Sequence, residues 1–114
     1  MKQTINSIIR NLHPKQLHKS NWSLDNPMQG HCYHASAALK ILYPEINLHV
    51  GKWNGEIHWW NSDNNGNIID ITATQYDKRF PYHKGRIWDK QIPYTTPLKK
   101  LLIAIRNDNK IKYW

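Results

Sequence analysis

Two turn signals in the middle of the chain most restrict its fold, because each joins stretches that resemble β-strands. Asn54-Gly55 is a two-residue hairpin signal that separates an alternating apolar and polar stretch at 46–53 from a second extended stretch at 56–62. A polar turn at 63–66 then leads into a third stretch at 67–72. These features predict three strands in an antiparallel meander.

The second turn decides which side chains meet across the meander. A three-residue loop, Asp63 to Asn65, followed by Gly66 in a left-handed position, places His58 directly opposite Asp70. Both side chains then share one face of the sheet, whereas a loop of two or four residues would put them out of register. The opposite face would carry Ile57, Trp59, Ile69 and Ile71.

Apolar residues at helical spacing predict helices on both sides of the meander. The first helix follows Thr4 as its N-cap and ends at His13-Pro14, and the second begins near Cys32 and runs to about Leu42. The last helix has Thr96 as N-cap, and its apolar positions end at Ile105 before a polar tail from Asn107.

The remaining segments are predicted to connect these elements. Residues 15–29 form a long loop, 72–76 begin a short helical turn, and 77–95 form a wrapping loop without a clear period. The 114 residues are enough for one domain and too few for two. The sequence therefore predicts a single α+β domain at 1–114, in which the helix that carries Cys32 packs on a small antiparallel sheet.

Charge and cysteine content restrict the partners and the compartment. The 16 Lys and Arg outnumber the 8 Asp and Glu, and they are spread along the chain rather than clustered in an arm. A formal charge of +8 therefore predicts weak, nonspecific binding of polyanions. The single cysteine excludes an intrachain disulfide, and no stretch approaches the roughly 18 apolar residues of a membrane span. We expect a cytoplasmic protein without a membrane partner.

Three residues form a candidate catalytic constellation. Cys32 opens a helix, where backbone N–H groups and the helix dipole favour a thiolate. His58 offers a base, and Asp70 offers a carboxylate that would orient it. Each residue alone has an ordinary structural role, as a small buried apolar group, an interior histidine and a strand-end carboxylate. Their conjunction on one helix and two adjacent strands indicates acyl-transfer chemistry.

The same residues carry a resemblance to a known family. Residues 26–39, 58–60 and 69–76 resemble small, mostly uncharacterised bacterial and phage proteins with the pattern G-x-C-x-x-A, H-W-W and D-x-T-x-x-Q-[FY], and 81–86 resemble their P-Y-x-x-G segment. That family is similar to papain-like enzymes of the NlpC/P60-like and transglutaminase-like types. The resemblance implies a papain-like fold, a bacterial cytoplasm or the bacterial host of a phage, and a Cys32, His58 and Asp70 triad.

This resemblance also implies a reaction and a substrate class. His58 would deprotonate Cys32 for attack on a peptide, protein or other amide-bearing substrate, without a cofactor or a metal. The outcome would be that of a peptidase, amidase, deamidase or transferase. The backbone N–H of Cys32 would bind the oxyanion with one further donor. Candidates for that donor or for substrate contacts are Gln29, His31, Gln75, Trp59 and Trp60.

Three alternatives remain open. A zinc site would use His31, Cys32, His34 and His58, although their spacing matches no common zinc motif. A non-catalytic papain-like module would use its positive surface and aromatic residues to bind single-stranded nucleic acid or a host protein. A purely structural role is the third alternative.

Overall fold

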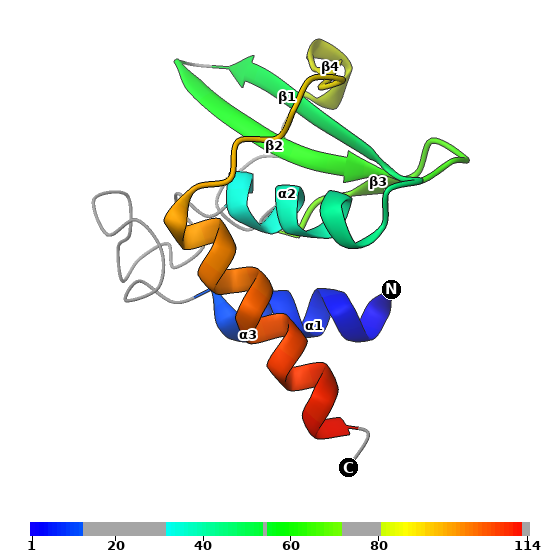
Figure 1. The fold of residues 1–114 in the computed structure, drawn as a ribbon. Helices are drawn as coiled ribbons and strands as arrows, with labels where there is room; N and C mark the ends of the chain where they lie inside the picture. The colour runs from blue at the N-terminus through cyan, green and yellow to red at the C-terminus, as the bar shows by residue number, and fades with distance from the viewer. Residues whose placement is uncertain (13–31, 54, 72–80, 113–114) are drawn as a thin grey trace.

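The computed structural model describes residues 1–12, 32–53, 55–71 and 81–112, and it has an α+β architecture in layers (Figure 1). A four-stranded sheet of order β3-β2-β1-β4 forms one layer, α2 packs beneath it, and α1 and α3 lie beyond α2. The elements in chain order are α1 (Lys2–Asn11), α2 (Cys32–Leu42), β1 (Asn47–Trp53), β2 (Glu56–Ser62), β3 (Ile68–Ile69), η3 (Tyr82–Lys84), β4 (Arg86–Ile87) and α3 (Thr96–Lys112).

The first predicted hairpin is confirmed. β1 and β2 pair antiparallel from Asn47 opposite Ser62 to Trp53 opposite Glu56. The two-residue turn that joins them requires a left-handed backbone, and Gly55 supplies it with φ of +79°.

The second hairpin has the predicted loop length but a register that differs from the prediction. Ile69 pairs with Asn61, and the Asp63 N–H donates to the Asn67 carbonyl at 3.0 Å, so the loop is 64–66 rather than 63–65. The Asp63 carboxylate fixes this choice, because it accepts hydrogen bonds from the backbone N–H groups of Asn65 and Asn67 at 2.9 Å each. The predicted direct opposition of His58 and Asp70 was therefore wrong.

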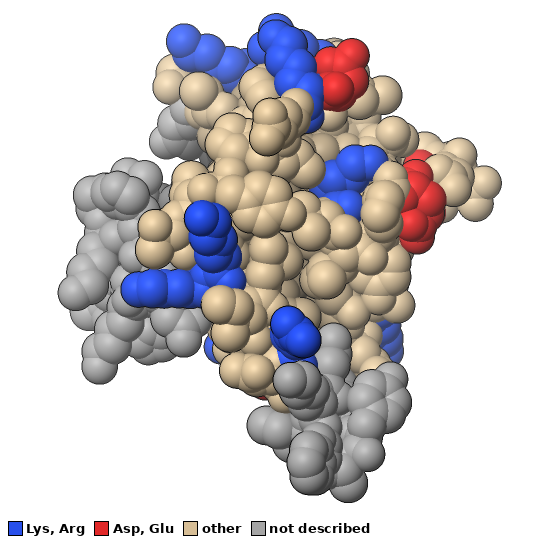
Figure 2. Space-filling model, in the orientation of Figure 1, with Lys and Arg blue, Asp and Glu red and all other residues tan. Residues whose placement is uncertain are grey.

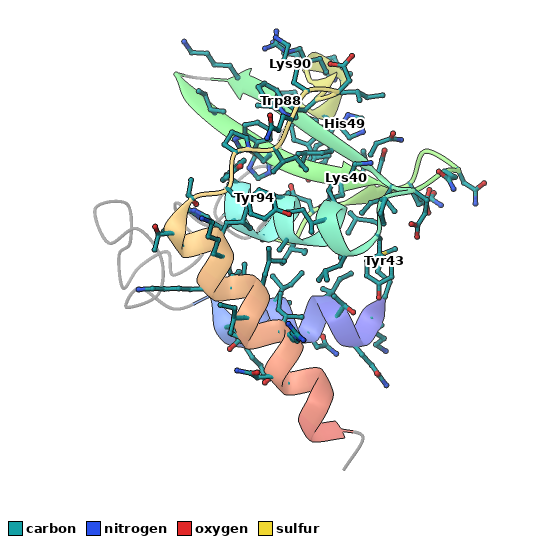
Figure 3. The ribbon with its side chains drawn as sticks, in the orientation of Figure 1. Lys40, Tyr43, His49, Trp88, Lys90 and Tyr94 are labelled. Carbon is teal, nitrogen blue, oxygen red and sulfur yellow. The ribbon has the colours of Figure 1, made fainter. Side chains whose placement is uncertain are left out.

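Two helix starts also differ from the prediction. α1 begins at Lys2, so Thr4 lies inside it, and its Oγ1 is 2.8 Å from the Tyr43 hydroxyl at the end of α2 (Figure 3). α3 is capped by Thr95, whose Oγ1 accepts the Leu98 N–H at 3.3 Å, so the cap precedes the predicted Thr96. α3 also continues past the predicted polar tail to Lys112.

The apolar core lies mainly between the helices. Small residues on α2 let α1 and α3 approach it closely, and burial of each large apolar side chain contributes roughly 1.5–3 kcal/mol. The core residues are Ile8, Ala35, Ala37, Ala38, Leu39, Ile46, Leu98, Leu101 and Ile105. In the described ranges no helix is long and apolar enough to cross a membrane.

Part of the predicted wrapping loop has regular structure. β4 pairs with β1 at two positions, with Ile87 opposite His49 and Arg86 opposite Val50. η3 precedes it, and a Cβ at Gly85 would collide with the Trp60 ring, so only glycine permits this close approach. The predicted loop at 15–29 and helical turn at 72–76 lie outside the described residues.

Candidate active site

Cys32 lies at the first described turn of α2, where the side chain packs against the edge of β2. Its Sγ is 4.0 Å from the carbonyl oxygen of Ile57, and Ser36, one turn later, donates to the carbonyl of Trp59 at 3.1 Å. In the described part of the chain, β3 pairs with β2 only at Asn61 and Ser62. α2 therefore contacts the edge of β2 at Ile57 and Trp59, where β2 has no described strand beside it on that edge.

Strand alternation places His58 on the opposite side of the sheet from the body of α2. Trp59 contacts the Tyr33 ring of α2 with centroids 5.0 Å apart, and the Asn61 amide donates to the Ser36 carbonyl at 3.0 Å. Odd-numbered residues of β2 thus face α2, and His58 faces away. Cys32 lies at the β2 edge and is a hydrogen-bond partner of this imidazole, as its position at the helix start opposite His58 predicts.

His58 and Asp70 form a buried pair. The imidazole Nε2 is 2.7 Å from Asp70 Oδ2, and the side chains are 0 % and 4 % exposed. With the observed register Asp70 follows β3 at a position diagonal to His58 rather than opposite it. A loop of odd length keeps both residues on one face, so the contact survives the change of register.

The Cys32 sulfur is a second hydrogen-bond partner of the same imidazole, which donates to it when protonated. Because Asp70 occupies Nε2, the nitrogen that can serve the thiol is Nδ1. Burial alone would lower the pKa of His58, but the hydrogen bonds and charges of Asp70 and Cys32 raise that pKa to about 9. The imidazole is therefore predominantly protonated at neutral pH, between a thiol and a carboxylate.

Tyr82 extends this chain of contacts. Its hydroxyl donates to Asp70 Oδ2 at 2.7 Å, so one carboxylate oxygen accepts both His58 and Tyr82. The other oxygen, Oδ1, is buried and has no hydrogen-bond partner among the described residues. Tyr82 is not among the predicted site residues, although it lies in the P-Y-x-x-G segment on which the resemblance partly rests.

The comparison with family models places this site within a family. The model described as YunG protein matches residues 2–101. The chain belongs to the YunG family. The match includes Cys32, His58, Asp70 and Tyr82, while no curated protein and no solved structure matches the chain.

Trp59 and Trp60 of this YunG-family chain lie on opposite sides of the sheet. Trp60 is 1 % exposed, stacks on His58 with centroids 5.7 Å apart, and contacts Tyr82 at 5.2 Å. It therefore supports the His58 ring from the interior. Trp59 lies on the α2 side between Tyr33 and Trp88, and Figure 3 shows Trp88 beside the sheet.

The other predicted site residues are only partly placed. Gln29, His31 and Gln75 lie outside the described residues. His34 is buried, with Nε2 3.3 Å from the Thr95 hydroxyl at the start of α3. In the part of the chain that the structure describes, no group of three or more His, Cys, Asp or Glu residues is arranged to hold a metal ion.

Proposed function

We propose that this chain is a thiol-dependent acyl-transfer enzyme in which Cys32 is the nucleophile, His58 the acid and base, and Asp70 the orienting carboxylate. The observation that carries the proposal is the continuous hydrogen-bonded chain from the Cys32 thiol through the imidazole to Asp70. A cysteine next to a protonated histidine at a helix start is the environment in which thiolates form.

In the proposed reaction the Cys32 sulfur attacks the carbonyl carbon of an amide, and a carbon–sulfur bond forms as the carbonyl becomes an oxyanion. The oxyanion would lie against the backbone N–H of Cys32, the first described residue of α2. The imidazolium gives its proton to the leaving amine as the carbon–nitrogen bond breaks. Water or a second nucleophile, deprotonated by His58, then releases the acyl group and restores the thiol.

Alkylation of the single cysteine tests this proposal without a known substrate. We expect native wild-type protein to react with iodoacetamide at pH 7 at least about tenfold faster than His58→Ala, because the imidazolium favours the thiolate. His49→Ala is the matched control, because His49 also stacks on Trp60, at 5.6 Å, from the neighbouring strand. Its rate should stay within about twofold of wild type.

Circular dichroism and thermal melts would confirm that each variant is folded, and Asp70→Asn gives a second, milder perturbation of the same imidazole. Equal labelling rates in wild type, His58→Ala and His49→Ala would contradict the enzymatic proposal. That result would favour the non-catalytic binding module.

A further inference from the structure

A positively charged groove adjoins the candidate active site at the tip of the β1–β2 hairpin. It encloses about 400 Å³ and is lined by Val50, Gly51, Lys52, Ile57, Lys84 and Arg86. Figure 2 shows Lys and Arg side chains at this end of the molecule, with an acidic side chain beside them.

Among the side chains that the structure describes, no ion pair includes Lys52, Lys84 or Arg86. The ion pairs found there join Arg10 to Asp108 and His58 to Asp70. Lys52, Lys84 and Arg86 are all exposed. Like charges gathered around one groove produce a positive potential that an anionic ligand would offset.

The groove also offers an apolar surface and a strand edge. Ile57 is 59 % exposed and lies opposite Lys52 across the hairpin. Within the described residues, β4 pairs with β1 only at His49 and Val50, so the β1 edge at Lys52 has no neighbouring strand. The Trp88 N–H donates to the Leu48 carbonyl at 2.7 Å, which shows that even-numbered β1 residues direct their backbone groups to this edge. An extended peptide can pair with such an edge.

The groove is connected to the site through two of its lining residues. Ile57 provides the carbonyl that lies 4.0 Å from Cys32 Sγ, and Gly51 is the cross-strand partner of His58. The groove and the surroundings of Cys32 therefore share Ile57, and a peptide that reaches from the β1 edge at Lys52 to Cys32 at the β2 edge must cross the hairpin.

We propose that this groove binds an acidic segment of an extended peptide substrate and directs a neighbouring amide to Cys32. The inference rests on the proposed function, and charge complementarity with Lys52, Lys84 and Arg86 selects the acidic side chains. None of the described lining residues offers an aromatic ring on which a base of single-stranded nucleic acid can stack, which favours a peptide.

Fluorescence anisotropy with the full-length Cys32→Ala variant tests binding apart from chemistry. The probes are a fluorescein-labelled peptide of alternating Glu and Ala, the same peptide with Gln in place of Glu, and a single-stranded DNA of equal charge. We expect the Glu peptide to bind at least about tenfold more tightly than the Gln peptide, because only carboxylates complement the three cations.

Charge reversal locates the binding. Lys52→Glu/Arg86→Glu should weaken binding of the Glu peptide by roughly tenfold or more, whereas Lys99→Glu/Lys100→Glu, an equal change of charge at exposed positions of α3, should weaken it by less than about threefold. Lys52→Gln/Arg86→Gln is a milder pair that should give an intermediate loss if reversal disturbs folding.

Several results would overturn the proposal. An equal loss of peptide affinity in the two charge-reversed variants would show that the peptide binds only through the overall positive charge of the protein. Equal binding of the Glu and Gln peptides would exclude recognition of carboxylates. Tighter binding of the DNA that depends on Lys52 and Arg86 would assign the groove to nucleic acid. Groove-dependent peptide binding together with an inert Cys32 would instead refute the proposed function and leave the acidic-peptide site in place.

Discussion

Asp70 and Asp108 each accept hydrogen bonds from several side chains, but Asp70 does so in the interior and Asp108 at the surface. Asp70 is 4 % exposed, and its Oδ2 accepts hydrogen bonds from both His58 and Tyr82. Asp108 is 28 % exposed, and its Oδ2 accepts a hydrogen bond from the Ser7 hydroxyl at 2.6 Å. Arg10 and Asn11 also donate to this oxygen.

The difference in burial gives the two networks different roles. Water can replace much of what Asp108 provides, so its network mainly fixes α1 against α3 at a modest gain in stability. Asp70 has little access to water, and its charge determines whether the buried imidazole carries a proton. The exposed network of three donors therefore joins two helices, whereas the buried network of two donors sets the charge of an imidazole.

Removal of the charge of Asp70 or Asp108 should produce the largest difference in stability between the two networks. At pH 6, where His58 is protonated, Asp70→Asn leaves a buried imidazolium without its counterion, which costs about 3–5 kcal/mol of unfolding free energy. Asp108→Asn should cost about 1 kcal/mol or less. Urea unfolding of both variants measures these values, and equal losses would show that burial does not distinguish the two sites.

The two networks should also lose their contributions to folding stability at opposite ends of the pH scale. The pKa of His58 is raised from 6.5 to about 9, so its contribution to stability is complete below about pH 6.5 and is lost as the pH rises through 9. The difference amounts to about 3 kcal/mol. Hydrogen bonds from Ser7, followed by Asn11 and Arg10, lower the pKa of Asp108 despite partial desolvation, so its contribution is lost only as the pH falls below 3.8.

Urea unfolding from pH 3 to pH 10 measures both effects. The loss between pH 6.5 and 9 should be absent in His58→Gln, and the loss at acidic pH should be smaller in Asp108→Asn. An unchanged alkaline slope in His58→Gln would assign that slope to other groups.

Tyr82→Phe should produce a smaller effect that is confined to the buried network. Loss of the hydroxyl removes one of the two side-chain donors to Asp70 among the described residues, at a cost of about 1 kcal/mol. Since Asp70 positions His58, the iodoacetamide rate of Cys32 should also fall by about two- to fivefold. Tyr94→Phe, at an exposed position, is the control and should change neither quantity. A loss of stability with an unchanged labelling rate would give Tyr82 a structural role alone.

Features that depend on neighbouring residues were predictable from the sequence. Asn54-Gly55 and the extended stretches beside it fix the first hairpin, and the helical spacing after Cys32 fixes α2. The second turn was placed one residue too early, because the side chain of Asp63 selects between two adjacent three-residue loops. The approach of His58 to Asp70 was still predictable, since an odd loop keeps them on one face.

Features that depend on distant contacts were not predictable. β4 has only two residues and no period, and its position depends on Gly85 against Trp60. α3 extends beyond its apolar positions, and Asp108 in this extension bonds to side chains of α1. Tyr82 acquires its role only when this segment folds over Asp70.

Titration of His58 by NMR measures the coupling of Cys32, His58 and Asp70 directly. We expect a pKa near 9 for His58 in the wild type. In Asp70→Asn this pKa should fall by at least about one unit, and in Cys32→Ala it should fall by a smaller amount. Asp108→Asn should leave the pKa of His58 unchanged. A His58 pKa near 6.5 in the wild type that is insensitive to both substitutions would contradict the account.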